Sequence, residues 1–119
     1  MLGNERMDRL VRLMDVSVVE AHVHAANLAN QNTPGYRTKA VDFTRAFEQA
    51  LERGDHAGAM DIEPQLVEPR NTAVDVDGND VSPDREILAA ADNAMRYNAY
   101  ISILRGQMRL MNIAVGQSP

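Results

Sequence analysis

The chain has 119 residues, a net charge of −5 and no cysteine, and 45% of its residues are hydrophobic while only 4% are aromatic. This length allows one domain at most, and the scarcity of aromatic side chains favours a small helical core over a large enzyme pocket. The absence of cysteine excludes disulfides, cysteine-ligated clusters and thiol nucleophiles.

Charge is distributed unevenly along the chain. Residues 42–86 carry twelve acidic and four basic side chains, whereas the two ends are mildly basic. This overall acidity argues against a nucleic-acid partner, which requires a concentrated basic face. Charged residues interrupt the first fourteen positions, and no run of about 18 apolar residues occurs. We therefore expect neither a cleaved signal peptide nor direct insertion into a membrane.

Residues 1–32 form the first predicted segment, with a long amphipathic helix from about Asn4 to Asn30. Its apolar residues alternate at spacings of four and three, which is the pattern of a heptad seam. We interpret this seam as a subunit interface formed by Met7, Val11, Met14, Val18, Ala21, Ala25 and Leu28.

A corner is predicted where this helix ends. Proline disfavours helical backbone in the residue before it, and Pro34-Gly35 has the residue types for the centre of a type II turn. The last helical turn is rich in amides, which can bond to free carbonyl groups or to a neighbouring chain. We predict an ordered, contact-making corner formed by Asn27, Asn30, Asn32, Thr33, Pro34, Gly35 and Tyr36.

Residues 33–54 are predicted to continue as a turn, an extended segment and a short helix. Asp42 is the expected N-cap of that helix, and Gly54 is its expected stop. Phe43, Phe47 and Leu51 are spaced four residues apart, so they lie on one helical face.

Residues 55–82 are predicted to be an irregular acidic loop that is disordered by itself, because it carries few large apolar residues. Residues 55–59 have the composition of a flexible linker. Short strand-like runs follow at residues 60–63, 65–68 and 74–76, and the prolines restrict such strands to sheet edges. A turn is expected before the last helix, at Asp77, Gly78, Asn79 and Asp80.

A second long helix is predicted over residues 83–119. Ser82 is a suitable N-cap, Pro83 fits the first helical position, and Asp84 and Glu86 complement the helix dipole. Apolar residues follow mostly at spacings of three or four. We assign them to the subunit interface: Ile87, Ala91, Ala94, Ile101, Leu104, Met108 and Met111.

The predicted fold is therefore mainly α. Long N- and C-terminal helices form an antiparallel, coiled-coil-like pair, with a short helix and an irregular, β-containing segment between them. One pair of helices does not enclose a core, so part of its apolar surface stays exposed unless other subunits cover it. The sequence thus predicts a component of an assembly.

No catalytic, cofactor or metal site is predicted. His22 and His24 are two residues apart, so on a helix they point about 200° apart and cannot share a metal ion. Positions 1, 3, 5 and 12 of a calcium loop would be Asp75, Asp77, Asn79 and Glu86. However, Asp80 stands where such a loop needs glycine, and Pro83 interrupts it. No nucleophile pattern or phosphate loop occurs, so the chain is not expected to be an enzyme.

Two blocks of sequence carry a resemblance to a known family. The segment Asn27-Leu28-Ala29-Asn30-Gln31-Asn32-Thr33-Pro34-Gly35-Tyr36 resembles the N-terminal signature of bacterial flagellar rod and hook proteins. The second block, Asp77-Gly78-Asn79-Asp80-Val81 with Asp84-Arg85-Glu86 and Ala91-Asp92-Asn93-Ala94, resembles the membrane-proximal rod proteins of that family. Together the similarity covers about residues 7–52 and 75–115.

The resemblance implies a structural subunit of the flagellar basal body. Family members are exported unfolded by the flagellar type III apparatus without a cleaved signal. They assemble helically into the periplasmic rod, in which the terminal helices form an inner layer that transmits torque around the export channel. The implied partners are other copies of the chain, the axial proteins FliE and FlgC, the distal rod proteins, the MS ring and the export apparatus.

An alternative function is a soluble helical adaptor or regulatory binding module, for example a homodimeric coiled coil. This alternative explains the two heptad seams but not the corner rich in asparagine, proline and glycine. Size-exclusion chromatography separates the two, because an adaptor forms a discrete oligomer whereas a rod subunit is monomeric or polymerises.

Overall fold

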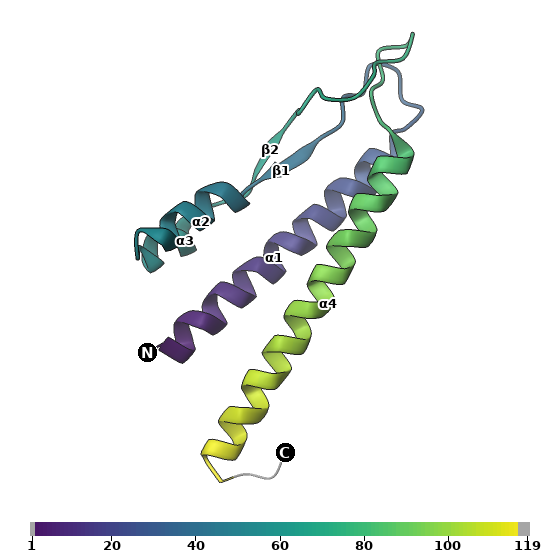
Figure 1. The fold of residues 1–119 in the computed structure, drawn as a ribbon. Coiled ribbons are helices and arrows are strands. Elements are labelled where there is room, and N and C mark those ends of the chain that lie inside the picture. The colour runs from purple at the N-terminus through teal and green to yellow at the C-terminus, as the bar shows by residue number, and fades with distance from the viewer. Residues whose placement is uncertain (1, 117–119) are drawn as a thin grey trace.

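The computed structural model describes residues 2–116, and the chain is mainly helical (Figure 1). The elements in chain order are α1 (Leu2–Ala29), β1 (Ala40–Asp42), α2 (Thr44–Glu52), α3 (His56–Asp61), β2 (Gln65–Val67) and α4 (Pro83–Ala114). The molecule is elongated, with extents of 63 × 32 × 14 Å. The predicted fold class, with long terminal helices and short strands between them, is confirmed.

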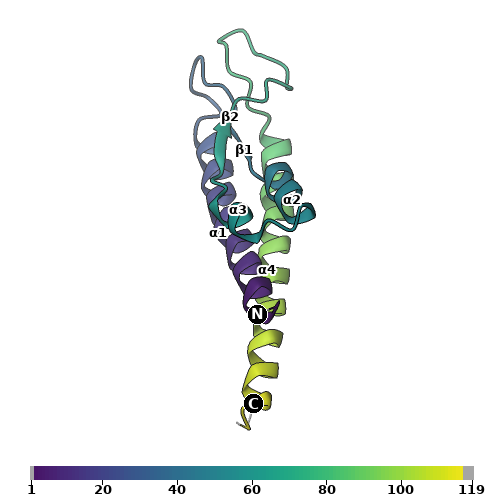
Figure 2. The same cartoon turned by 90° about the vertical axis from the view of Figure 1, so that its left-hand side faces the viewer.

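The two terminal helices run antiparallel from a common end of the molecule (Figure 1). They lie closest near that end, where His24 Nδ1 is 2.8 Å from Glu86 Oε2. About two helical turns further from that end, Asn93 Nδ2 donates a hydrogen bond of 2.8 Å to the carbonyl of Ser17. Towards its C-terminus α4 continues past the N-terminal end of α1 (Figure 2). The last turns of α4 therefore have no helix of the same chain beside them.

The start of α4 follows the sequence prediction. Ser82 is the N-cap residue with extended backbone, and Pro83 occupies the first turn together with two acidic residues, Asp84 and Glu86. The Ser82 hydroxyl makes no capping hydrogen bond within the described part of the chain. Proline and the acidic residues consequently define this helix start without the side-chain cap.

Residues 40–67 form an arm that packs against α1. Strands β1 and β2 pair antiparallel, with Val41 opposite Leu66, and α2 and α3 lie beyond them (Figure 1). The core of the molecule is at this contact and contains Val16, Phe43, Phe47, Ala50 and Ala59. The rings of the two phenylalanines stack with centroids 5.0 Å apart. The predicted apolar face is confirmed, because both phenylalanines are buried and Leu51 packs against them.

The predicted linker at residues 55–59 and the predicted strand at 60–63 are wrong, because α3 covers most of the first and half of the second. Asp55 caps this helix by accepting a hydrogen bond of 2.9 Å from the Gly58 backbone. Ala59 is fully buried, and Met60 and Ile62 pack against the same core. A good N-cap and burial against α1 outweigh the low helix propensity of glycine.

Two further local predictions differ from the structure. Asp42 is not the N-cap of α2; it ends β1, and Phe43 occupies the cap position. Residues 74–76 do not form a strand, because the backbone there is used in a turn. Asp75 N donates to the Asn79 carbonyl at 2.8 Å, and Gly78 N donates to the Asp75 carbonyl at 2.9 Å. Gln65–Val67 is the one of the three predicted runs that forms a strand among the described residues.

Candidate assembly interface

The corner and the turn before α4 meet at one end of the molecule, and we call this contact the corner junction (residues 27–39 with residues 72–81). Asn79 Nδ2 donates hydrogen bonds to the carbonyls of Asn30 at 2.9 Å and Thr33 at 2.8 Å. Gly35 N donates to the carbonyl of Asp77 at 2.8 Å. The two sequence blocks that carry the family resemblance are thus bonded directly to each other.

Asn27 is fully buried in the corner junction, and its amide makes three hydrogen bonds. Its Nδ2 donates to the Lys39 carbonyl at 2.8 Å. Its Oδ1 accepts from Lys39 N at 3.0 Å and from the Tyr36 hydroxyl at 2.9 Å. Burial of the ring raises the pKa of Tyr36, and the nearby carboxylates Glu86 and Asp80 add to this rise while Lys39 opposes it. One side chain of α1 therefore fixes the path of the extended segment that follows.

Asp80 is a buried carboxylate that is both hydrogen-bonded and ion-paired. Its Oδ1 accepts a hydrogen bond of 2.5 Å from Thr38 N. Its Oδ2 lies 3.2 Å from Arg37 Nε. Its backbone carbonyl accepts from the hydroxyls of Thr38 at 3.2 Å and Thr72 at 2.5 Å. A buried charge is costly unless it is paired and hydrogen-bonded, and this one is both.

Two glycines allow the backbones of the corner junction to approach. Gly35 has φ +75° and the Tyr36 amide donates to the Thr33 carbonyl at 3.2 Å, as the predicted type II turn requires. Gly78 has φ +86°, and a Cβ atom added there would lie 3.3 Å from Gly35 Cα. Both positions favour glycine, and Gly78 leaves little space for a side chain.

The other predicted corner residues lie at the surface. Asn32, Thr33 and Pro34 are exposed. Asn30 Nδ2 donates to the Ala26 carbonyl at 2.8 Å, so this amide bonds to a carbonyl near the end of α1, as one of the predicted uses requires.

The calcium-loop residues are used for structure. Asn79 is committed to the corner junction, and Glu86 contacts His24. Within residues 2–116 no group of three or more histidine, aspartate or glutamate side chains is placed to hold a metal ion. No helix in the same range is both long and apolar enough to cross a membrane.

No residue of the α1 heptad seam is fully buried against α4. The seam residues Met7, Val11, Met14, Val18, Ala21, Ala25 and Leu28 are all exposed or half-buried. Four of them, Val18, Ala21, Ala25 and Leu28, line an open groove of about 470 Å³ beside the contact with α4. Ala94, from the predicted seam of α4, lines the same groove. The structure thus brings five predicted interface residues together on one apolar surface.

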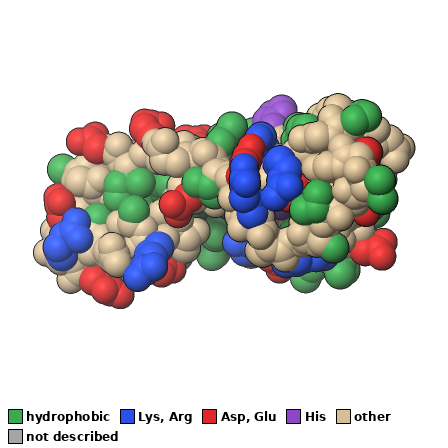
Figure 3. All heavy atoms as spheres, turned by 90° about the horizontal axis from the view of Figure 1, so that it is seen from above, with side chains coloured by type: hydrophobic (Ala, Val, Ile, Leu, Met, Phe, Trp, Pro, Cys, Tyr) green, Lys and Arg blue, Asp and Glu red, His purple; other side chains and the backbone are tan. Residues whose placement is uncertain are grey.

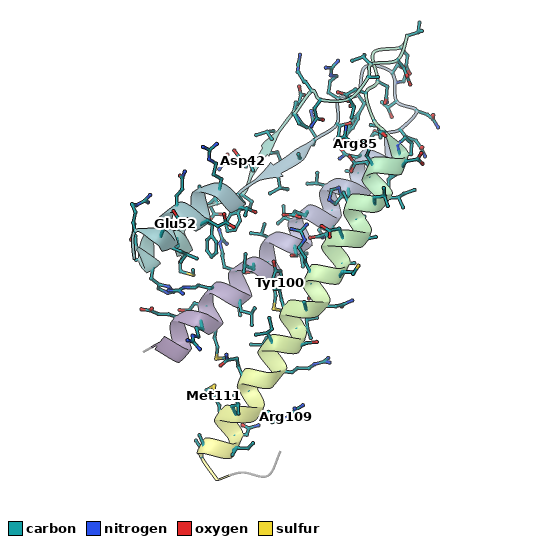
Figure 4. The ribbon with its side chains drawn as sticks, in the orientation of Figure 1. Asp42, Glu52, Arg85, Tyr100, Arg109 and Met111 are labelled. Carbon is teal, nitrogen blue, oxygen red and sulfur yellow. The ribbon has the colours of Figure 1, made fainter. Side chains whose placement is uncertain are left out.

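Helix α4 leaves most of its apolar side chains uncovered. Its only buried residues along Pro83–Ala114 are polar, namely Glu86 and Asn93. Among the predicted interface residues, Ile87, Ala91, Ala94, Met108 and Met111 are exposed, and Ile101 and Leu104 are half-buried. Met111 and Arg109 lie on the segment that extends past α1 (Figure 4). Further exposed apolar residues are Leu88, Met95, Ile103, Leu110, Ile113 and Val115.

Sequence reasoning missed the polar contacts that hold α4 to α1. These involve Ser17, His24 and Asn93, together with Arg96 Nη2 at 3.6 Å from Glu20 Oε2. Asn93 was one clue, because it is a polar residue within a run of alanines on an otherwise apolar stripe. Its Oδ1 accepts no hydrogen bond from any group in residues 2–116.

Viewed from the corner end, acidic and basic side chains are interspersed over the surface (Figure 3).

Comparisons with known proteins agree with the resemblance seen in the two motifs. No family model matches the chain. It is 29% identical over 131 residues to the flagellar basal body rod protein FlgB of Escherichia coli (strain K12), covering 92% of this chain and 95% of that protein. It is 31% identical over 104 residues to FlgB of Yersinia ruckeri, covering 73% and 76%. It is 25% identical over 127 residues to FlgB of Borrelia hermsii, covering 92% and 94%. The chain therefore belongs to the FlgB family of flagellar basal body rod proteins.

Proposed function

We propose that the chain is a structural, non-enzymatic subunit of the flagellar rod that assembles helically through α1 and α4. The observation that supports this most is the composition of the α4 surface. A helix of 32 residues buries only Glu86 and Asn93 within its own chain. At 100° per residue, its exposed apolar side chains lie on every side, which is typical of a helix enclosed by several neighbours.

The energetic reason for assembly is the apolar area that remains in water. Burying one leucine, isoleucine or methionine side chain contributes roughly 1.5–3 kcal/mol. Leu110 and Val115 are 65% and 70% exposed, and many other apolar side chains of α4 are also exposed. In the proposed rod, neighbouring subunits cover these side chains, and the resulting close-packed layer transmits torque across the periplasm around the export channel.

The corner junction sets the geometry of each subunit in this proposal. It joins α1 to α4 and directs residues 33–54 out of the inner layer, so that the arm lies outside it. Its buried amides and the Asp80 carboxylate form hydrogen bonds across more than 40 residues of sequence. A buried polar network of this kind favours one arrangement of the two helices.

The proposed partners follow from the family. They are other copies of the chain, FliE, FlgC, the distal rod proteins and the MS ring. The type III apparatus would deliver the chain without cleavage of a signal. Residues 1–32 and 83–119 would form the inner layer, with residues 55–82 at its outside.

Replacing Pro34 and Gly35 together with alanine tests the function of the corner. Alanine is strained at φ +75°, so the turn should shift and the variant should be lost from isolated basal bodies. The matched control is Gly54→Ala, which carries a similar strain at φ +72° but lies away from the corner junction. Normal rod assembly and swimming of the double variant would contradict the proposed function of the corner.

A further inference from the structure

The groove beside the α1–α4 contact is open and mostly apolar. Four alanines are among its lining residues, Ala21 and Ala25 from α1 and Ala90 and Ala94 from α4, and we call these four the alanine floor. Val18 and Leu28 also line it. Small side chains between two helices let a third helix approach closely, because side-chain ridges fit into such grooves. Along α1 the groove runs from Ser17 to Leu28, which is about 17 Å at 1.5 Å per residue.

The free end of α4 is a helix of matching length and character. Residues 103–115 span about 18 Å, and Leu104, Met108, Met111 and Val115 repeat at spacings of four, three and four. Three of these four side chains are at least half exposed. Methionine adapts to irregular surfaces, which suits a groove lined by alanine and valine.

Charge makes the end of α4 complementary to Asp15, which lies on α1 outside the groove lining, in a neighbouring hollow with Met7 and Val11. No acidic residue follows Asp92 in the chain, and Arg105 flanks the seam of the free segment. On α1, Asp15 lies one turn before Val18, is exposed, and forms no ion pair with the charged side chains between residues 5 and 116. The segment of the same chain does not fill the groove, because it continues α4 in a direction that leads away from it (Figure 1).

We propose that this groove receives the C-terminal segment of α4, residues 103–115, from a second copy of the chain. Leu104, Met108 and Met111 of that copy lie on the alanine floor, and its Arg105 faces Asp15. This inference rests on the proposed function, because it names the partner of the same surface.

The experiment uses the natural absence of cysteine in the chain. Cells produce two forms of the full chain with different tags, one carrying Ala25→Cys and the other Met111→Cys, and isolated basal bodies are treated with a short bis-maleimide. A cross-link between the two tags is expected, at a yield at least tenfold above that of a control pair. The control replaces Ala25→Cys with Ala46→Cys, which is exposed on α2 away from the groove.

Each outcome decides the question. Both forms present in basal bodies without a cross-link, or with equal cross-linking in the control pair, would contradict the groove while leaving the rod function intact. A cross-link from Ala25→Cys only to a protein of another mass would also overturn it, because a different axial protein would then fill the groove. Absence of both forms from basal bodies would instead contradict the rod function and with it this inference.

A second variant fills the groove without introducing a cross-link site. Ala94→Leu places a larger side chain on the groove floor, whereas Ala99→Leu adds the same atoms to an exposed position elsewhere on α4. With helicity of the free chain unchanged in both, incorporation into basal bodies should fall at least tenfold for Ala94→Leu alone. Equal incorporation of the two variants would overturn the proposal.

Discussion

Asn79 joins the two parts of the corner junction through its side chain. Replacing it with alanine removes the side-chain donor to the carbonyls of Asn30 and Thr33 and the acceptor of Val81 N, three hydrogen bonds in all. At roughly 0.5–1.5 kcal/mol for each hydrogen bond, we expect Asn79→Ala to lower the free energy of unfolding by about 2–4 kcal/mol in urea titrations followed by circular dichroism. Asn32→Ala, which changes an exposed amide of the same motif, should lie within about 0.5 kcal/mol of the wild type. Similar values for the two variants would contradict the structural importance of the junction.

Replacing Gly78 with alanine separates the effect of backbone strain from the effect of a new Cβ atom that crowds a neighbouring backbone. Alanine at Gly78 and at Gly54 carries the same left-handed strain, about 1–2 kcal/mol, because their φ values are +86° and +72°. Only at Gly78 does the new Cβ meet another backbone, 3.3 Å from Gly35 Cα. We therefore expect Gly78→Ala to lower the unfolding free energy more than Gly54→Ala does. If the two variants lose the same unfolding free energy in thermal or urea unfolding, the close approach of Gly78 to Gly35 has no effect on stability.

The raised pKa of Tyr36 predicts how the stability of the folded chain changes at alkaline pH. Burial raises the pKa of Tyr36 above its ordinary value of 10.0, so the folded chain favours the neutral phenol. The stabilisation from this group is fully present below pH 10 and is lost as pH rises through the raised pKa. In absorbance titrations, the ionisation step that disappears in Tyr36→Phe should lie above pH 10. The stability difference between the two proteins should shrink over the same range; a step at or below pH 10 would contradict the burial of this phenol.

At the scale of elements, replacing an apolar side chain with alanine should have opposite effects in the arm and at the free end of α4. Phe47 is 3% exposed in the core between α1 and α2, so Phe47→Ala should lower the unfolding free energy of the free chain by about 3–5 kcal/mol. Leu110 is 65% exposed, so Leu110→Ala should change it by less than about 0.5 kcal/mol while reducing incorporation into basal bodies. A large loss of free-chain stability in Leu110→Ala would mean that α4 is already covered within one molecule.

The same contrast explains which elements could be predicted from the sequence. Local sequence patterns predict the terminal helices and the apolar face of α2. These patterns are the spacing of apolar residues and, for α4, the Ser82-Pro83 pair at the start of the helix. Helix α3 is six residues long, and it depends on one aspartate cap and on burial of Ala59 against other elements. Its composition alone resembles a linker, and short helices draw their stability from such tertiary contacts.

The candidate site was predictable in its pieces but not in its assembly. The corner and the turn before α4 each have a clear local pattern, yet Asn79 bonds to Thr33 across 46 residues and to Asn30 across 49. No periodicity encodes a contact at that separation. The seam residues were identified by spacing, but the polar contacts of Ser17 and Asn93 determine that this seam borders a groove and does not fill the α1–α4 contact.

Considered whole, the molecule is an elongated body with its hydrophobic core at one side and a long uncovered helix at the other. The core joins α1 to the arm, whereas α4 is attached to α1 by polar contacts near the corner and extends beyond it (Figures 1 and 2). The uncovered end of α4, residues 103–115, has the length at which an isolated helix is marginal in water, roughly 12–15 residues. Its order therefore depends on other subunits that cover it.

Amide hydrogen exchange of residues 103–115, measured in the free chain and in isolated basal bodies, tests this dependence most directly. The account predicts rapid exchange in the free chain and exchange slowed by roughly a hundredfold or more in the rod, because packing suppresses local opening. Equal protection of these amides in both samples, with the chain confirmed in the basal bodies, would contradict it.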